Sequence, residues 1–90
     1  MSHRIVNFLH IVGAIGMTSV YSNEYRMVIR TLREARIDSN ITQDALAKAF
    51  GRPQSFIAKV ESGERRLDVV EFVRFCRLVN IEPASILKKL

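Results

Sequence analysis

Apolar residues recur at helical spacing in two short runs between residues 42 and 63, and the two runs meet at a corner. The first run places three apolar residues on one face of a helix that begins after residue 42: Leu46, Ala47 and Phe50. Thr42 can cap the free amides of the first turn, and Asp44 is favourably placed near the positive end of the helix. Gly51 ends this helix, because glycine tolerates the left-handed conformation in which helices commonly close.

The second run predicts a helix from Pro53 to Ser62, which Gly63 ends. Proline suits the first helical position, where its missing amide hydrogen costs nothing. One side of this helix is apolar and comprises Phe56, Ile57 and Val60. The remaining positions include three polar residues, Gln54, Ser55 and Lys59. Two short helices joined by a tight corner indicate a helix-turn-helix, and these polar side chains suit the base edges and phosphates of a DNA groove.

Three further helices are predicted around this pair, and no strand is predicted. A helix over residues 23–37 has an apolar face and an outer row of arginines: Arg26, Arg30 and Arg33. Asp68 and Glu71 have capping-box spacing at the start of a helix over residues 69–79. That helix is predicted to bury Val69, Val70, Phe72, Val73, Cys76 and Val79. A short last helix opens at Pro83, so the expected fold class is all-α with five helices.

Residues 1–20 differ from the rest of the chain, because they are apolar on all sides and contain Gly13 and Gly16. The predicted division is a leader or arm over residues 1–20 and one helix-turn-helix domain over residues 21–90. The apolar run is short for a membrane span. Three interpretations stay open: a secretory signal, an arm that packs on the domain or on a second subunit, and a leader upstream of a true start at Met17. The poor cleavage-site pattern favours the last two.

Length, charge and cysteine content limit the classes of function that the protein can have. Ninety residues allow one small domain. A net charge of +5 and an isoelectric point near 10.0 favour a polyanionic partner. A single cysteine, Cys76, excludes an internal disulfide framework and fits a reducing compartment. The sequence has no histidine cluster and no cysteine pair, which argues against metal or catalytic chemistry. We therefore expect no enzymatic activity and no cofactor. The expected location is the bacterial cytoplasm, on the nucleoid.

The chain carries LREAR at residues 32–36 and ITQDALAKAFGRPQSFIAKVESGERRLDVVEF at residues 41–72. Through these motifs the stretch from about Ser22 to Leu90 resembles the Xre-type helix-turn-helix family, which includes the lambda-like phage repressors and the Cro proteins. The resemblance implies a five-helix, lambda-repressor-like domain that binds DNA as a symmetric dimer. The helix after the corner would then lie in the major groove. Residues 1–20 have no counterpart in the family.

The resemblance also implies roles for individual residues. Base contacts are expected from Gln54, Ser55 and Lys59. Phosphate contacts are expected from Gln43, Arg52, Arg65 and Arg66, although the last two could equally form a solvated charge pair. Arg36 and Glu61 are expected to pair and so to fix the angle of the second helix of the motif. Two roles stay open for Phe56: its side chain could lie at the margin of the core or contact DNA.

We therefore predict a sequence-specific, DNA-binding transcriptional regulator, specifically a homodimeric repressor that reads a palindromic operator on double-stranded DNA. The apolar last helix, with Ile86, Leu87 and Leu90, could supply the dimer interface or complete the monomer core. An antitoxin with a toxin or other protein partner, or a restriction–modification controller, would share the same domain. A protein-interaction adaptor that reads no DNA is the alternative from another class, and it would tolerate charge reversal at Arg52 and Lys59. No association with a membrane is expected.

Overall fold

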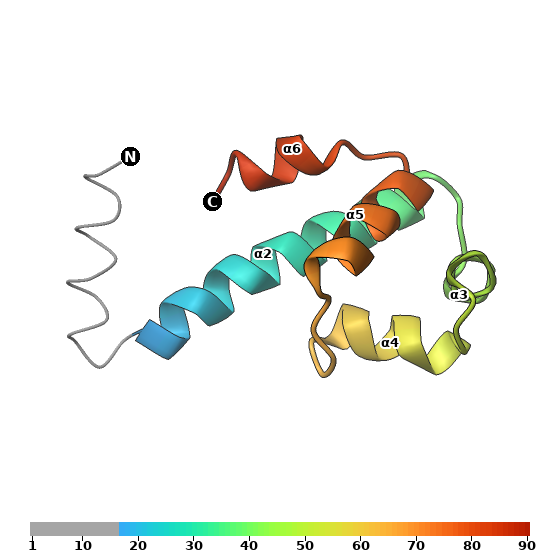
Figure 1. Cartoon of the computed structure of the whole chain (residues 1–90), viewed down its shortest axis with the longest axis horizontal. Helices are drawn as coiled ribbons and strands as arrows, with labels where there is room; N and C mark the ends of the chain where they lie inside the picture. Colours follow the sequence, from blue (N-terminus) through green and yellow to red (C-terminus); the bar gives the residue numbers. More distant parts are fainter. Residues whose placement is uncertain (1–16) are drawn as a thin grey trace.

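The structure is a computed structural model that describes residues 17–90, with side chains described from residue 23 onwards. This part of the chain consists of five α-helices and contains no strand: α2 (Met17–Asp38), α3 (Gln43–Phe50), α4 (Gln54–Ser62), α5 (Val69–Leu78) and α6 (Pro83–Leu87). α3 packs on α4 and α5, and α4 also packs on α2, so that the pair α3–α4 lies beside the C-terminal half of α2 (Figure 1). The predicted all-α class with five helices is confirmed for the described residues.

Several predicted helix boundaries differ from the structure, and α2 ends at Asp38, one residue beyond the predicted end. α2 begins at Met17 instead of residue 23, because the sequence MTSVYS contains no glycine or proline that would end a helix. The predicted boundary between residues 20 and 21 consequently falls inside α2. Pro53 lies just before α4 with extended backbone, and α5 ends one residue early, at Leu78. The interpretations of the leader concern mostly residues that lie outside the described part.

The predicted helix ends have the expected caps. Thr42 Oγ1 accepts a hydrogen bond of 3.0 Å from the backbone amide three residues later. Gly51 closes α3 with a φ of 75° and Gly63 closes α4 with a φ of 86°, a conformation that glycine adopts without steric cost. Asp68 and Glu71 form a capping box with hydrogen bonds of 2.7 and 3.0 Å in the two directions. These caps define both ends of α3, the end of α4 and the start of α5.

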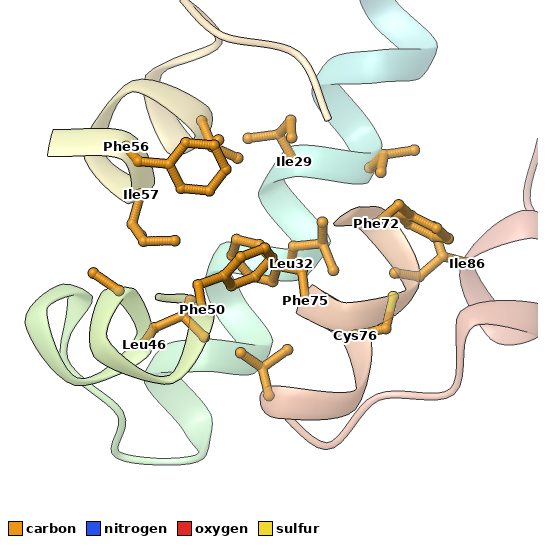
Figure 2. Packing of buried hydrophobic residues seen from close by; sticks show 14 residues of the cluster. Ile29, Leu32, Leu46, Phe50, Phe56, Ile57, Phe72, Phe75, Cys76 and Ile86 are labelled. Carbon is orange, nitrogen blue, oxygen red and sulfur yellow. The ribbon is translucent and has the colours of Figure 1, made fainter. Parts of the chain in front are cut away.

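An apolar core lies between the helices (Figure 2). Its most deeply buried members are Leu32, Leu46, Ile57, Val60, Phe75, Cys76, Val79 and Ile86. Phe56 belongs to this core with an exposed fraction of 8%, and its ring centroid lies 5.5 Å from that of Phe50. Burial raises the pKa of the Cys76 thiol to about 11, which fits the structural role predicted for it.

The start of α5 departs from the predicted pattern. Val69 and Val70 were expected inside, but their exposed fractions are 75% and 65%, because the first turn of α5 projects beyond the core. Phe75, which the predicted buried set omits, is completely buried. In α6, Ile86 completes the core whereas Leu87 is 53% exposed. Ile86 of the last helix is therefore used inside the monomer, whereas Leu87 is an exposed apolar residue, as are Val69 and Val70 at the start of α5.

Candidate nucleic-acid interface

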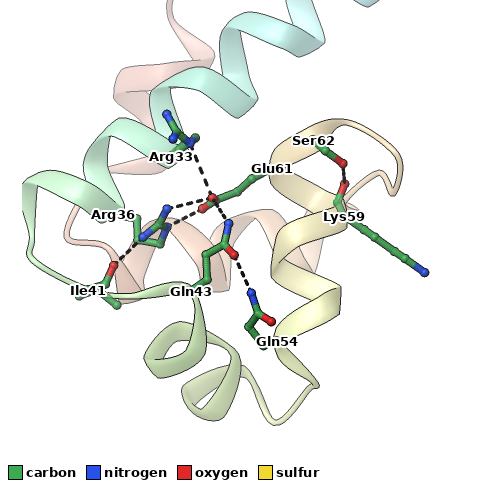
Figure 3. Close-up of polar contacts among 8 residues, drawn as sticks. All are labelled: Arg33, Arg36, Ile41, Gln43, Gln54, Lys59, Glu61 and Ser62. Carbon is green, nitrogen blue, oxygen red and sulfur yellow. Dashed lines mark hydrogen bonds and ion pairs between the residues drawn. The ribbon is translucent and has the colours of Figure 1, made fainter.

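The outer side of α4 is polar and open to solvent. Its apolar residues Phe56, Ile57 and Val60 all point into the core, as helical spacing requires. Gln54, Ser55 and Lys59 are exposed on the remaining surface, and the Lys59 side chain extends away from the helix pair (Figure 3). The three residues predicted to contact bases thus lie together on one exposed helix, in positions that a duplex groove could accept.

On the side of α2, α4 is fastened by a buried ion pair. Arg36 donates from Nε to Glu61 Oε2 at 2.6 Å and from Nη2 to Glu61 Oε1 at 3.0 Å (Figure 3). A third donor, Nη1, bonds the carbonyl oxygen of Ile41 at 2.8 Å. The side chains of Arg36 and Glu61 are only 10% and 4% exposed. A bidentate pair with a third hydrogen bond fixes both the distance and the angle between α2 and α4.

A hydrogen-bond chain continues from this pair to the start of α4. Gln43 Nε2 donates to Glu61 Oε1 at 2.9 Å, and Gln54 Nε2 donates to Gln43 Oε1 at 2.7 Å. Gln43, predicted to contact a phosphate, therefore links α3 to α4. Gln54, predicted to read a base, uses one amide hydrogen in this chain and keeps its carbonyl oxygen and second hydrogen for a ligand. These hydrogen bonds hold the Gln54 side chain in one orientation.

On the opposite side of α4, the carboxylate of Glu71 contacts two of the arginines that are predicted to bind phosphates. Arg65 donates to Glu71 from Nη1 at 2.5 Å and from Nη2 at 3.1 Å. Arg52 Nη2 lies 3.6 Å from Glu71 Oε2. Both guanidinium carbons lie 4.8 Å from the centroid of the Phe56 ring. The corner before α4, the helix itself and the loop after it are thereby joined at one cluster, which we name the rim cluster: Arg52, Phe56, Arg65 and Glu71.

The contacts within the rim cluster favour the charged forms of Glu71 and Arg65. The hydrogen bonds from Arg65 lower the pKa of Glu71 below the ordinary value of a glutamate, and the backbone amide of Asp68 adds to the effect. The same contact with Glu71 raises the pKa of Arg65. Glu71 therefore stays ionised well below neutral pH, and the arginines keep their negative partner.

Arg66 does not join the rim cluster. Its guanidinium carbon lies 4.5 Å from the centroid of the Tyr25 ring in α2, and the Tyr25 hydroxyl oxygen accepts a hydrogen bond of 3.1 Å from the amide of Leu67. The two adjacent arginines of the loop thus attach it to different helices. Arg66 is exposed and remains available to a polyanion, but it lies apart from Arg52 and Arg65.

Two parts of the site are absent from the predicted set of residues. Phe56 serves as a platform for two guanidinium groups, and Glu71, recognised in the sequence as a helix cap, also holds both arginines. The four-residue spacing of Arg52 and Phe56 gave no helical signal for the first contact, because Arg52 lies in the corner before α4 begins. No local signal connects Arg52 with Glu71, because the loop between α4 and α5 brings them together.

Among residues 17–90 no group of three or more histidine, cysteine, aspartate or glutamate side chains lies where it could hold a metal ion. None of the helices in this range is long and apolar enough to cross a membrane.

Known proteins resemble the chain in sequence and in structure. A family model described as "Helix-turn-helix domain" matches residues 28–86. The structure resembles a solved structure described as an "XRE-family like protein from Pseudomonas syringae pv. tomato str. DC3000", with 43% sequence identity and a TM-score of 0.78. That match covers 82% of this chain and 90% of the other. No curated protein matches the chain.

Proposed function

Because the chain belongs to the Xre-type helix-turn-helix family of DNA-binding regulators, we propose that it is a sequence-specific transcriptional regulator that reads DNA with α4. The observation that carries this proposal is the exposed polar side of α4, on a helix that carboxylate-centred contacts fasten on both sides. A fixed helix angle matters because base readout requires donors and acceptors at defined positions in the major groove.

Base contacts would come from the first two turns of α4. The carbonyl oxygen and second amide hydrogen of Gln54 match the N6 donor and N7 acceptor of adenine. Ser55 can donate to or accept from a base edge. Lys59, one turn further on, can reach guanine O6 and N7 or a phosphate. The hydrogen bond from Gln54 to Gln43 would orient the reading amide before DNA arrives.

Phosphate contacts would flank the groove on both sides of α4. Gln43 lies at the start of α3, where free helix amides also attract a phosphate. Arg52, Arg65 and Arg66 carry positive charge around the other end of the motif. Together with the net charge of +5, these contacts predict an affinity that falls steeply with salt concentration, because each phosphate contact releases counterions.

We further propose that the chain binds as a two-fold dimer and represses transcription in the bacterial cytoplasm. Val69 and Leu87 line one pocket of about 210 Å³, and both are largely exposed. Together these two residues supply exposed apolar surface suited to a self-complementary contact. A dimer would present two copies of α4 about 34 Å apart, one turn of B-DNA, and would select a palindrome. A dimer bound to an operator that overlaps a promoter would block access of the polymerase.

The test is selection from a library of random duplexes by the purified full chain, followed by sequencing. We expect enrichment of a palindrome by the wild type and its loss in the double variant Gln54→Ala, Lys59→Ala. Lys88→Ala, which removes one exposed charge beyond α6, is the matched control and should enrich the same palindrome. If the wild type enriches no sequence, the regulator function is wrong; if it enriches a sequence without two-fold symmetry, the dimer is wrong.

A further inference from the structure

One carboxylate, Glu71, holds two arginines from opposite ends of α4. Arg52 lies in the corner before the helix and Arg65 in the loop after it, and the two are thirteen positions apart in sequence. Resting on the proposed function, we propose that Glu71 is a positioning residue for DNA binding: it holds the guanidinium groups of Arg52 and Arg65 over Phe56, in place for the phosphates that border the groove.

The two arginines have different amounts of hydrogen-bonding capacity left. Arg65 uses Nη1 and Nη2 on Glu71, and Nη1 also donates to the carbonyl oxygen of Arg66 at 2.6 Å. Arg52 approaches Glu71 no closer than 3.6 Å, and its side chain is 49% exposed. Most of the five N–H donors of Arg52 are therefore free for a phosphate. Arg65 acts mainly as the link that ties the loop to Glu71, and Arg52 is the group presented to DNA.

The benefit of this arrangement is a smaller loss of freedom on binding. A long arginine side chain that contacts a phosphate normally loses rotamer freedom when the complex forms. Here the contact with Phe56 and the attraction of Glu71 restrict Arg52 already in the free protein. Glu71 is itself restrained, because it also accepts from the Asp68 amide and its side chain is only 12% exposed.

Simple electrostatics predicts the opposite effect on DNA affinity when the charge of Glu71 is removed. A negative charge beside the phosphates repels DNA, so its neutralisation should strengthen binding to any duplex. Positioning predicts that the same change weakens binding to the preferred duplex, because Arg52 loses its restraint. The sign of the effect of Glu71→Gln therefore separates a positioning residue from a bystander charge. Glutamine keeps the shape and can still accept the capping hydrogen bond from Asp68.

The experiment compares the full-length wild type and Glu71→Gln on two duplexes, the palindrome that the wild type enriches and a scrambled duplex of equal composition. For Glu71→Gln we expect affinity for the palindrome to fall about three- to tenfold, the range for one side chain that must be ordered anew. Affinity for the scrambled duplex should stay equal or rise. The slope of log K against log salt on the palindrome should fall by about 0.9, the value for one lost phosphate contact. A merely destabilised but folded protein would not change this slope.

Two further variants keep the test decisive. Glu64→Gln removes an exposed charge from the same loop, where the Glu64 carboxylate accepts a hydrogen bond from the Ser62 hydroxyl and the Glu64 backbone amide donates to the same hydroxyl. This variant should bind both duplexes equally well or more tightly. If Glu71→Gln does not fold, Arg52→Lys carries the test, because it keeps the charge and loses the flat guanidinium group. Equal or tighter binding of the palindrome by Glu71→Gln, or by Arg52→Lys in its place, would overturn the positioning role and leave the regulator function intact. Failure of the wild type to enrich any duplex would overturn both.

Discussion

The two sides of α4 use the same chemistry in different surroundings. Toward α2, Glu61 pairs with Arg36, and their side chains are 4% and 10% exposed. Toward α5, Glu71 pairs with Arg65, and there the arginine side chain is 39% exposed. The buried pair can only hold the helix, whereas the half-exposed pair holds the helix and still presents positive charge to solvent. Burial, more than the identity of the residues, therefore separates a structural contact from one that can also take part in binding.

Removal of Glu61 should have the largest effect on stability. Glu61→Ala leaves the Arg36 guanidinium buried without its negative partner, which costs about 3–5 kcal/mol of unfolding free energy. Urea unfolding followed by circular dichroism measures this loss. Glu64→Ala is the control, because Glu64 is exposed, and it should change stability by less than about 0.5 kcal/mol. A loss for Glu61→Ala below about 1 kcal/mol would mean that the buried pair does not hold α4.

Removal of Glu71 should destabilise the fold less. Glu71→Ala loses one partner of the α5 capping box and a half-exposed ion pair, and we expect a loss of about 1–2 kcal/mol. The same urea unfolding measures it beside Glu61→Ala. Equal losses for the two variants would contradict the distinction between a buried and a half-exposed pair.

Acid should weaken the contact at Glu71. The pKa of this carboxyl group is lower in the folded protein than its ordinary value of about 4.3, so its stabilising effect is complete above that value. The effect is lost as the pH falls through the lower pKa of the folded state. Unfolding free energies measured between pH 6 and pH 3 should therefore fall more steeply for the wild type than for Glu71→Gln. Parallel curves would show that the ion pair does not form in solution.

Local sequence signals predicted most of the fold. Thr42, Gly51, Gly63 and the Asp68–Glu71 box mark helix ends through interactions within a few residues, so their roles can be read without tertiary structure. Burial in α5 was predicted less well, because helical spacing cannot tell how far a helix extends beyond the core. Val69 lies on the same helix face as Phe72, but in a first turn that no other helix covers.

The residues of the candidate site were predicted one by one, and of its connections only the pair of Arg36 with Glu61 was predicted, from the family resemblance. The family resemblance indicated Gln43, Arg52 and Gln54 one at a time. The hydrogen bonds that join Gln43 with Gln54, and the carboxylate shared by Arg52 and Arg65, depend on how α3, α4 and α5 pack. Contacts between residues 11 or more positions apart leave no periodic pattern, so the links from Gln43 to Gln54 and from Arg52 to Glu71 required the structure.

The smallest effect on stability is expected at Arg52, with a clear effect on binding. Arg52→Ala removes an exposed contact with Phe56, and we expect at most about 1 kcal/mol of destabilisation. Its slope of log K against log salt should fall by about 0.9. Arg77→Ala removes an exposed arginine of α5 and should leave the slope unchanged. Equal slopes for wild type and Arg52→Ala would remove Arg52 from the phosphate contacts.

The most direct test of groove reading by α4 is methylation interference with dimethyl sulfate on the duplex that the wild-type chain enriches. This reagent methylates guanine N7 in the major groove and adenine N3 in the minor groove, so one experiment reports on both grooves. We predict that binding is blocked by guanine N7 methylation in two half-sites about 34 Å apart, and not by adenine N3 methylation in the same half-sites. In half-sites that contain guanine, interference by adenine N3 methylation alone, or by neither modification, would contradict the insertion of α4 into the major groove.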